Sequence, residues 1–335
     1  MKNRINRASK IITFAGVMAI MAGQIGCRQQ PASPSSVVAE AQMLKVGQAG
    51  IFDPKGLVAK GAELVKLGEG FRFTEGPATD KEGNVFFTDQ PNDRIIRWDA
   101  ATNQVSTFLE NTGRSNGMYF DAAGNLISCA ELHGEVRSID KNGNHTVLVA
   151  GYQGKPFNGP NDIWVAPNGG MYITDPLYKR DFWAANDPRR EGIPQGGYYL
   201  YYVRPDRKSI VRADENLVKS NGVIGTPDGR KLYVSDIDDQ KIYVYDIQLD
   251  GSLANRQLFC SMRSDGMTID NQGNIYLTNA LGVTAFSPSG EKVLNIPTGE
   301  GWTANVTFGG KDRSMLFITA MGAVYGLRMN VKGAN

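Results

Sequence analysis

Hydrophobic and polar residues alternate with a period of two along much of the chain, in short runs that turn residues separate. The clearest example is a segment whose runs occupy residues 117–121, 126–131, 134–140 and 145–151, with AAGN and KNGN as two of the separators. A period of two is typical of half-buried strands, and Gly-Asn pairs are typical of tight turns. This segment therefore predicts four consecutive antiparallel strands.

The same unit recurs along the chain. Similar motifs, FFTD, LISC, MYITD, LYVSD, IYLTN and LFITA, occur in the second run of the six copies. They end at residues 89, 129, 175, 236, 279 and 320, which gives spacings of 40, 46, 61, 43 and 41 residues. Repeats of about 40–50 residues built from short strands indicate a β-propeller with four strands per blade. The sequence therefore predicts an all-β protein, a six-bladed β-propeller over residues 44–330.

A small polar residue stands eight positions ahead of a turn glycine in five of the six copies, and we call these the axial positions. The pairs are Glu75 with Gly83, Asn116 with Gly124, Asn161 with Gly169, Asn221 with Gly229, and Asp265 with Gly273. In the sixth copy, Asn305 leads into Gly309 and Gly310 with a shorter offset. Ring closure would bring all six side chains to one axis, because each occupies the same place in its repeat.

Two carboxylates and four carboxamides at one axis predict a site for a hard cation, Ca²⁺ first and Mg²⁺ or Mn²⁺ next. The chain contains only two histidines, and they do not form a metal-binding pair, so a histidine-based zinc site is not expected. Some axial residues would alternatively cap turns through hydrogen bonds to their own backbone.

Charge and hydropathy exclude two classes of partner. The formal charge of the 335 residues is +2, but the first 26 residues contain four bases and no acid. The remainder carries 32 bases and 34 acids, a net charge of −2, which gives no reason to expect nucleic-acid binding. No run of about 20 apolar residues follows the N-terminus, so nothing there is expected to span a bilayer.

Residues 1–27 have the pattern of an export signal, with four bases ahead of a largely apolar run and then small residues. The end of this segment, MAGQIGC, resembles a bacterial lipoprotein signal in which Cys27 is lipidated, although Gln24 stands where leucine is usual. Cleavage near Ala22, releasing a soluble secreted protein, is the alternative. Residues 28–43 are rich in Pro, Ser and Gln and predict a disordered linker. We therefore expect an exported, periplasmic protein anchored to the outer membrane.

Four short motifs carry a family resemblance. They are FRFTEGP at 71–77, NGPNDIWV at 158–165, KSNGV at 219–223 and SDGMTID at 264–270. From about residue 66 to residue 327 the chain resembles the SMP-30/gluconolactonase/LRE-like family of six-bladed propellers. The segments 114–137, 154–176 and 306–310 resemble its gluconolactonase branch. The resemblance implies that Glu75, Asn161, Asn221 and Asp265 bind a divalent metal, most simply Ca²⁺, with Mg²⁺, Mn²⁺ or Zn²⁺ as alternatives.

The implied activity is hydrolysis of a sugar lactone, in which the metal polarises the ring carbonyl and stabilises the oxyanion that forms when water attacks. The resemblance makes Asp265 either the general base or only a metal ligand, and Asp162 either a second candidate base or a residue that orients Asn161. Two other functions remain open, a metal-dependent esterase or organophosphate hydrolase, and a non-catalytic ligand-binding propeller that holds a structural ion.

Further residues are candidates for contact with a lactone or sugar-acid substrate. Asn116 would contact substrate or cap a turn. The segment that contains His133 and Arg137 resembles a Cys-Glu-His stretch of the family. His133 would transfer protons or be structural, and Arg137 would hold a carboxylate or hydroxyl-rich substrate. The long interval between the third and fourth blades contains residues 176–197, where Tyr178, Phe182 and Trp183 would either stack on a sugar ring or pack on a neighbouring blade. The oligomeric state is not predicted.

Overall fold

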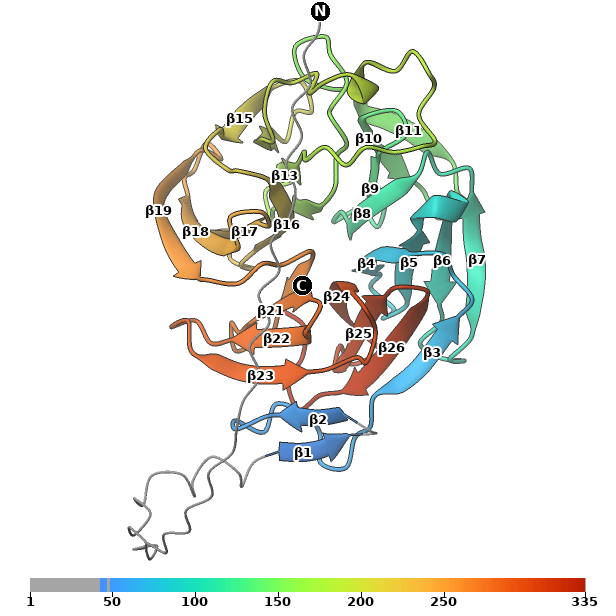
Figure 1. The fold of residues 1–335 in the computed structure, drawn as a ribbon, viewed down its shortest axis with the longest axis vertical. Helices are drawn as coiled ribbons and strands as arrows, with labels where there is room; N and C mark the ends of the chain where they lie inside the picture. Colours follow the sequence, from blue (N-terminus) through green and yellow to red (C-terminus); the bar gives the residue numbers. More distant parts are fainter. Residues whose placement is uncertain (1–42, 47–48, 335) are drawn as a thin grey trace, which may run out of the picture. The chain divides into compact units, whose positions relative to one another are not determined.

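The computed structural model describes residues 43–46 and 49–334, which form six antiparallel sheets around a central axis (Figure 1). The inner strands lie nearest the axis and the outer strands lie on the periphery. This arrangement confirms the predicted six-bladed β-propeller. The predicted signal, the lipidation of Cys27 and almost all of the predicted linker lie outside the described residues and stay predictions.

Each of the first three blades has four strands, named here from the inner to the outer edge. Blade one consists of β4 (Thr74–Thr79), β5 (Val85–Asp89), β6 (Arg94–Trp98) and β7 (Val105–Glu110). Blade two consists of β8 (Ser115–Phe120), β9 (Leu126–Ala130), β10 (Glu135–Ile139) and β11 (His145–Val149). Blade three consists of β12 (Ile163–Val165), β13 (Met171–Thr174), β14 (Leu200–Val203) and β15 (Ile210–Asp214).

The other three blades follow the same order. Blade four consists of β16 (Ser220–Gly225), β17 (Lys231–Asp236), β18 (Lys241–Ile247) and β19 (Leu253–Cys260). Blade five consists of β20 (Met267–Ile269), β21 (Ile275–Asn279), β22 (Gly282–Phe286) and β23 (Lys292–Ile296). Blade six takes β24 (Thr303–Gly309), β25 (Met315–Ala320) and β26 (Ala323–Arg328) from the end of the chain.

The outer strand of blade six comes from the other end of the propeller sequence. It is β3 (Val65–Glu69), which pairs antiparallel with β26 through Ala323 with Glu69 and Val324 with Gly68. Blade five is extended by β2 (Ala49–Phe52) and β1 (Met43–Val46), so its sheet has six strands. Two short 3₁₀ helices, η1 (Gln90–Asn92) and η2 (Pro188–Arg190), lie in loops. No helix among the described residues is both long and apolar enough to cross a membrane.

The turn after each inner strand explains the recurring glycine. In blade one, Asp80 Oδ1 accepts a hydrogen bond from the Asn84 backbone N–H at 2.9 Å, and its Oδ2 accepts one from the Asn84 side chain at 2.8 Å. Gly83 has φ of 89° between them, a left-handed conformation in which a Cβ would be strained. Asp121 and Asp270 hold their turns in the same way. The carboxylates of the DxxGN turns are therefore structural.

Large apolar side chains fill the space between neighbouring sheets. Phe87 of blade one and Phe317 of blade six are fully buried, with ring centroids 5.6 Å apart. Trp164 and Tyr172 of blade three are also fully buried and pack among residues of blades four and five. Burial of each such side chain contributes about 1.5–3 kcal/mol to stability. This packing holds the inner strands, and hence the axial residues, in one arrangement.

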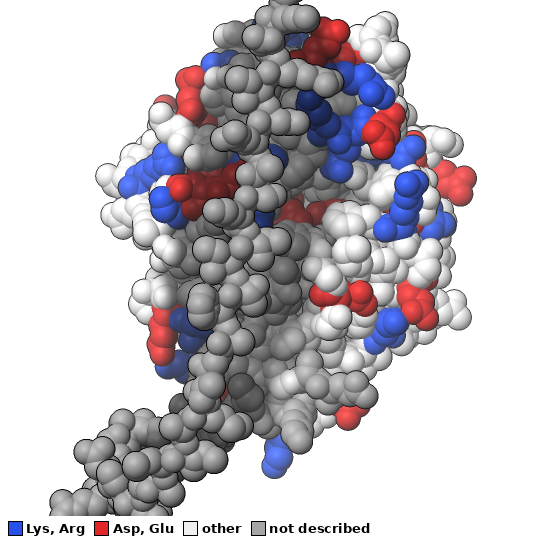
Figure 2. Space-filling model, in the orientation of Figure 1, with Lys and Arg blue, Asp and Glu red and all other residues white. Residues whose placement is uncertain are grey.

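Charged side chains of both signs are mixed over the visible face of the propeller (Figure 2). Several of them form local ion pairs within a blade, such as Arg97 with Asp99 at 2.8 Å and Lys231 with Asp246 at 2.5 Å. Exposed pairs of this kind contribute little to stability, typically below about 1 kcal/mol. The surface charge is therefore locally compensated.

Candidate active site

The axial residues lie where the inner strands break their regular pairing. Pairing of the inner strand with the next strand shifts register between Glu75 and Ala78, between Ser115 and Met118, and between Ser220 and Val223. Such bulges leave a residue unpaired and redirect side chains. Asn116 and Asn221 lie inside these irregular segments, and Glu75 is the last paired residue before its own. Asn161 and Asp265 lie just ahead of β12 and β20.

A cavity of about 260 Å³, which we call the upper cavity, opens at the end of the channel where the axial residues lie. Its described lining residues come from all six blades or from their loops. They are Phe73, Glu75, Gln90, Asn116, Asn161, Tyr178, Arg180, Ile237, Asp238, Arg263, Asp265 and Trp302. The structure thus brings Glu75, Asn161 and Asp265 to one cavity, and Asn221 contacts it through Asp265 and Tyr178.

The sixth copy differs from its predicted alignment. Val306 pairs with Ile318 as Ile163 pairs with Ile173, so Asn305 corresponds to Asp162 and Ala304 holds the axial position. The local hydrogen bonds agree, because each of these polar side chains accepts one from the next backbone N–H, at 2.8 Å for Asn305 and 3.0 Å for Asp162. Ala304 therefore occupies the sixth axial position, where Asn305 was predicted. Asn305 is the next residue along the strand and belongs to the layer below.

Blade two, which precedes Asp162, and blade five, which precedes Asn305, each have a glycine in this lower layer. The glycines make room for the two polar side chains. A Cβ on Gly117 would lie 2.5 Å from Asp162 Oδ1, and one on Gly266 would lie 2.0 Å from the Asn305 side chain. Both distances are far below van der Waals contact. The N-G and D-G steps of blades two and five therefore allow polar side chains from blades three and six to reach the axis.

Burial and mutual repulsion perturb the two axial carboxylates. Burial raises the pKa of Glu75 well above its usual value, and the neighbouring Asp265 raises it further. Burial raises the pKa of Asp265 to about 6, although hydrogen bonds from Trp302 and Asn221 act in the opposite direction. Two carboxylates that destabilise each other's charge in this way would be relieved by a cation between them.

Two axial carboxamides have buried oxygens without a hydrogen-bond partner. Asn221 is 1% exposed, and its Nδ2 donates to Asp265 Oδ1 and to the Tyr178 hydroxyl, each at 2.9 Å. Its Oδ1 is buried without a hydrogen-bond partner, as is Oδ1 of Asn116. Such buried acceptors are costly unless a ligand satisfies them. Together with Glu75 and Asp265, the Asn221 oxygen contributes to an all-oxygen donor set that suits a hard divalent cation.

The described residues contain no cluster of three or more His, Cys, Asp or Glu side chains that could hold a metal. A cation in the upper cavity would therefore depend on carboxamide oxygens in addition to the two carboxylates. Glu75, Asn161, Asn221 and Asp265 are the residues that would hold it. A protein ligand set of this size leaves coordination positions for water and substrate oxygens.

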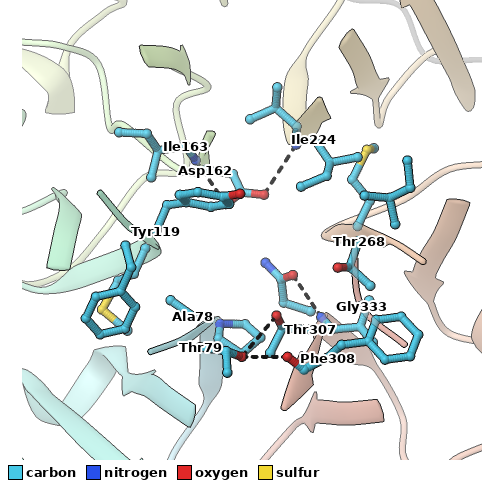
Figure 3. A pocket seen from close by; sticks show the side chains of 18 of the residues that line it. Ala78, Thr79, Tyr119, Asp162, Ile163, Ile224, Thr268, Thr307, Phe308 and Gly333 are labelled. Atoms are coloured by element: carbon cyan, nitrogen blue, oxygen red, sulfur yellow. Dashed lines mark hydrogen bonds between the residues drawn. The ribbon is translucent and has the colours of Figure 1, made fainter. Parts of the chain in front are cut away.

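The side chain of Asp162 points into a second cavity, of about 270 Å³, which we call the lower cavity (Figure 3). Its Oδ1 accepts from the Ile163 N–H at 3.0 Å and its Oδ2 accepts from the Val223 N–H at 3.3 Å. Burial raises the pKa of Asp162 to about 7, against the effect of these bonds. Asp162 therefore joins the inner strands of blades three and four and lies below the axial layer.

The insertion at residues 176–197 lies within blade three, between β13 and β14, instead of between blades three and four as expected. Tyr178 lines the upper cavity, as predicted for a substrate contact. Trp183 is buried, with the Arg189 guanidinium 4.4 Å from its ring centroid, and Phe182 packs against Arg114 at 4.8 Å. These two aromatic residues therefore pack against protein, and neither is among the lining residues of the cavity.

Glu131 fixes the insertion to blade two. Its carboxylate accepts from Arg180 Nε at 2.7 Å and Nη2 at 3.0 Å, and also from the Gln90 side chain. Arg189 donates to the backbone carbonyls of Glu131 and Leu132 at 2.6 and 2.7 Å. These contacts hold Tyr178 and Arg180 in the wall of the upper cavity.

His133 and Arg137 are not among the residues that line the upper cavity, and their contact with substrate stays a prediction. His133 is exposed in the loop between β9 and β10 and is not among the lining residues. Arg137 is buried in β10, where its Nε donates to Glu135 at 2.7 Å and its Nη1 donates to the Thr112 carbonyl at 3.2 Å. The bonds of Arg137 are those of a structural residue.

Trp302 is a functional candidate that sequence reasoning missed. Its Nε1 donates to Asp265 Oδ2 at 2.5 Å, while Asn221 donates to the other oxygen of the same carboxylate. Two donors fix the carboxylate plane relative to the axis. Trp302 lies one residue ahead of β24, and only its position before an inner strand could have indicated it. Phe73, Gln90, Arg180 and Arg263 reach the cavity from loops without repeat signals.

Comparison with known proteins identifies relatives that cover most of the chain. The family model described as SMP-30/Gluconolactonase/LRE-like region matches residues 73–322. A gluconolactonase of Zymomonas mobilis is 28% identical over 321 residues, covering 86% of this chain and 88% of that protein. A solved structure described as a putative gluconolactonase has a TM-score of 0.76 at 26% identity, covering 84% of this chain and 96% of that one. A gluconolactonase structure from Xanthomonas campestris has a TM-score of 0.73 at 27% identity, with coverages of 82% and 91%.

Proposed function

The chain belongs to the SMP-30/gluconolactonase/LRE-like family and is a lactone hydrolase, and from this premise we propose that it opens sugar lactones with the help of a divalent cation, Ca²⁺ first. The observation that supports the proposal is that Glu75 and Asp265 line one cavity, and that Asn221, whose Oδ1 is buried without a hydrogen-bond partner, donates to Asp265. When bound, the ion would supply Lewis-acid polarisation of the lactone carbonyl.

The protein's own groups position the reactants around that carbonyl. Tyr178, Asn116 and Gln90 present hydrogen-bonding groups suited to the hydroxyls of a sugar ring, and Phe73 and Trp302 supply apolar surface. In this proposal Asp265, which Asn221 and Trp302 hold in place, would receive the proton of an attacking water. The buried walls of the cavity strengthen each of these electrostatic interactions.

The test is hydrolysis of gluconolactone, followed by acid release and corrected for the spontaneous reaction. Chelation should abolish turnover, and adding back Ca²⁺, Mg²⁺, Mn²⁺ or Zn²⁺ one at a time should identify the ion. Asp265→Ala should abolish turnover, whereas Glu82→Ala, on an exposed turn, should not change it. Asp265→Asn keeps an oxygen ligand but cannot accept a proton, so retained cation binding with lost turnover would assign Asp265 as the base.

Two results would oppose the proposal. Activity that neither chelation nor Asp265→Ala affects would exclude metal-assisted hydrolysis at this site. Loss of thermal stability on chelation, without turnover of any lactone or ester, would instead favour a propeller in which the ion only joins the blades.

A further inference from the structure

Arg263 lies at the rim of the upper cavity on an aromatic platform. It precedes Asp265 by two residues, and its guanidinium lies 5.3 Å from the centroid of the Trp302 ring. Its backbone carbonyl accepts from Asn279 Nδ2 at 2.9 Å, which fixes the start of this side chain. The side chain is exposed and lines the cavity. Stacking on Trp302 limits its conformations and leaves its N–H groups directed to solvent and ligand.

The other cations at this mouth are already paired. Arg180 binds Glu131 through two nitrogens, and Lys219 lies 3.8 Å from Asp238. Arg263 takes part in no ion pair with a described residue. The formal charges that face the upper cavity without a compensating partner are therefore those of Glu75, Asp265 and Arg263.

A divalent cation held by Glu75 and Asp265 would neutralise both carboxylates and leave the positive charge of Arg263 uncompensated. Resting on the proposed function, we infer that Arg263 binds an anionic group, a carboxylate or phosphate, that the lactone carries away from its reacting carbonyl. An arginine fork binds such groups through two parallel hydrogen bonds, with a strength that neutral hydroxyls do not match. The position of Arg263 at the rim, with the axial residues deeper, places the anionic end of the substrate outward.

The inference makes Arg263 a residue that selects among lactones, and a matched pair of substrates tests it. Gluconolactone and the same lactone phosphorylated on its terminal hydroxyl differ only in the anionic group. In the metal-loaded protein, Arg263→Gln should lower kcat/KM for the phosphorylated lactone about tenfold or more. For the uncharged lactone, the change in kcat/KM should stay within about twofold. For the phosphorylated lactone, kcat/KM of Arg263→Lys should lie between that of Arg263→Gln and that of wild type.

A binding measurement gives a readout that is independent of turnover. Calorimetric titration with gluconate and with its terminal phosphate, both in Ca²⁺, should show that Arg263→Gln weakens only the phosphorylated acid. Arg230→Gln removes an exposed charge from the turn between β16 and β17 and is the matched control, expected to behave as wild type.

Equal effects of Arg263→Gln on both lactones and on both acids would overturn the inference, even where wild type hydrolyses the uncharged lactone well. Hydrolysis of neither lactone by wild type would instead defeat the proposed function, and with it the inference.

Discussion

The two ends of the central channel have cavities of similar volume but different chemistry. In the lower cavity, about 270 Å³, the carboxylates of Asp162 and Asp121 accept backbone N–H groups, and most other lining side chains are apolar. In the upper cavity, about 260 Å³, Asp265 is held by two side chains and faces Glu75. The orphaned oxygens of Asn116 and Asn221 belong to the axial layer at this upper end.

This difference shows what the protein does with buried acids. In the lower cavity the two carboxylates each accept backbone N–H groups. In the upper cavity Glu75 and Asp265 lie near each other and near unsatisfied oxygens, an arrangement that favours a cation. The two cavities are only one residue apart along the chain, just ahead of the inner strand of blade three. Asn161 lines the upper cavity and the next residue, Asp162, lines the lower one.

The largest effect is expected for the charge of Glu75. Glu75→Gln keeps the shape of the side chain but removes one of the two charges available to a cation, so turnover should fall on the order of a hundredfold or more. The rise in melting temperature on adding Ca²⁺ should also largely disappear. Steady-state kinetics and thermal melts measure the two effects.

Asp121→Asn in the lower cavity is the control for Glu75→Gln, since its carboxylate serves a turn. Full activity in Glu75→Gln, or loss of activity in Asp121→Asn, would contradict the division between the two cavities.

An intermediate effect is expected from the pH dependence of the metal-free protein. Asp162 has a pKa of about 7 when folded against 3.8 when unfolded, so the folded state binds the proton more tightly. Stability should therefore fall as pH rises from about 4 to about 7, by at most about 4 kcal/mol for this group, and level off above. Glu75 and Asp265, whose pKa values are also raised, act in the same direction.

Denaturant melts across this pH range, with and without Asp162→Asn, measure the contribution of the lower cavity. The variant should have a shallower pH slope than wild type, whatever its absolute stability. Identical slopes would show that Asp162 does not contribute to the pH dependence of stability as predicted. Added Ca²⁺ should flatten the slope that remains in the variant, because that part comes from the upper cavity.

The smallest effect is expected for His133. This exposed side chain lies outside the described lining of both cavities, so His133→Ala should change kcat/KM less than about twofold and leave the melting temperature unchanged. A large loss of kcat with normal folding would contradict this expectation and show that the loop between β9 and β10 contributes to the active site. Kinetics of the purified variant against wild type give the answer.

Repetition made the fold and most of the axial residues predictable. Glu75, Asn116, Asn161, Asn221 and Asp265 occupy equivalent places, and five equivalent places define the layer that faces the axis. Prediction failed where the repeat itself changes. Blade six has Ala304 at the axial position, so the nearest polar residue, Asn305, was aligned one position too far along the chain.

Residues outside the strands were harder to place. Trp302 and Arg263 come from loops, where no periodic pattern indicates which way a side chain points. Tyr178 was identified because the insertion in blade three lengthens the interval between two repeats. The sequence did not show that Glu131 would bind this insertion through Arg180. Arg137 became a candidate because its segment resembles the family, and the sequence did not show that its side chain would bond to Glu135 and to the Thr112 carbonyl.

The pairing of β3 with β26 has a consequence for how the molecule is made. Val65–Glu69 is synthesised before the strands of blade one, but its partner strand, Ala323–Arg328, follows all the other described strands. The ring therefore cannot close until residues 323–328 have been synthesised, and until then β3 lacks the strand with which it pairs. A chain released without its last thirty or so residues would keep most of its blades and lose the closure between them. Such fragments would be prone to associate through their open edges, so the pairing of β3 with β26 protects the whole propeller.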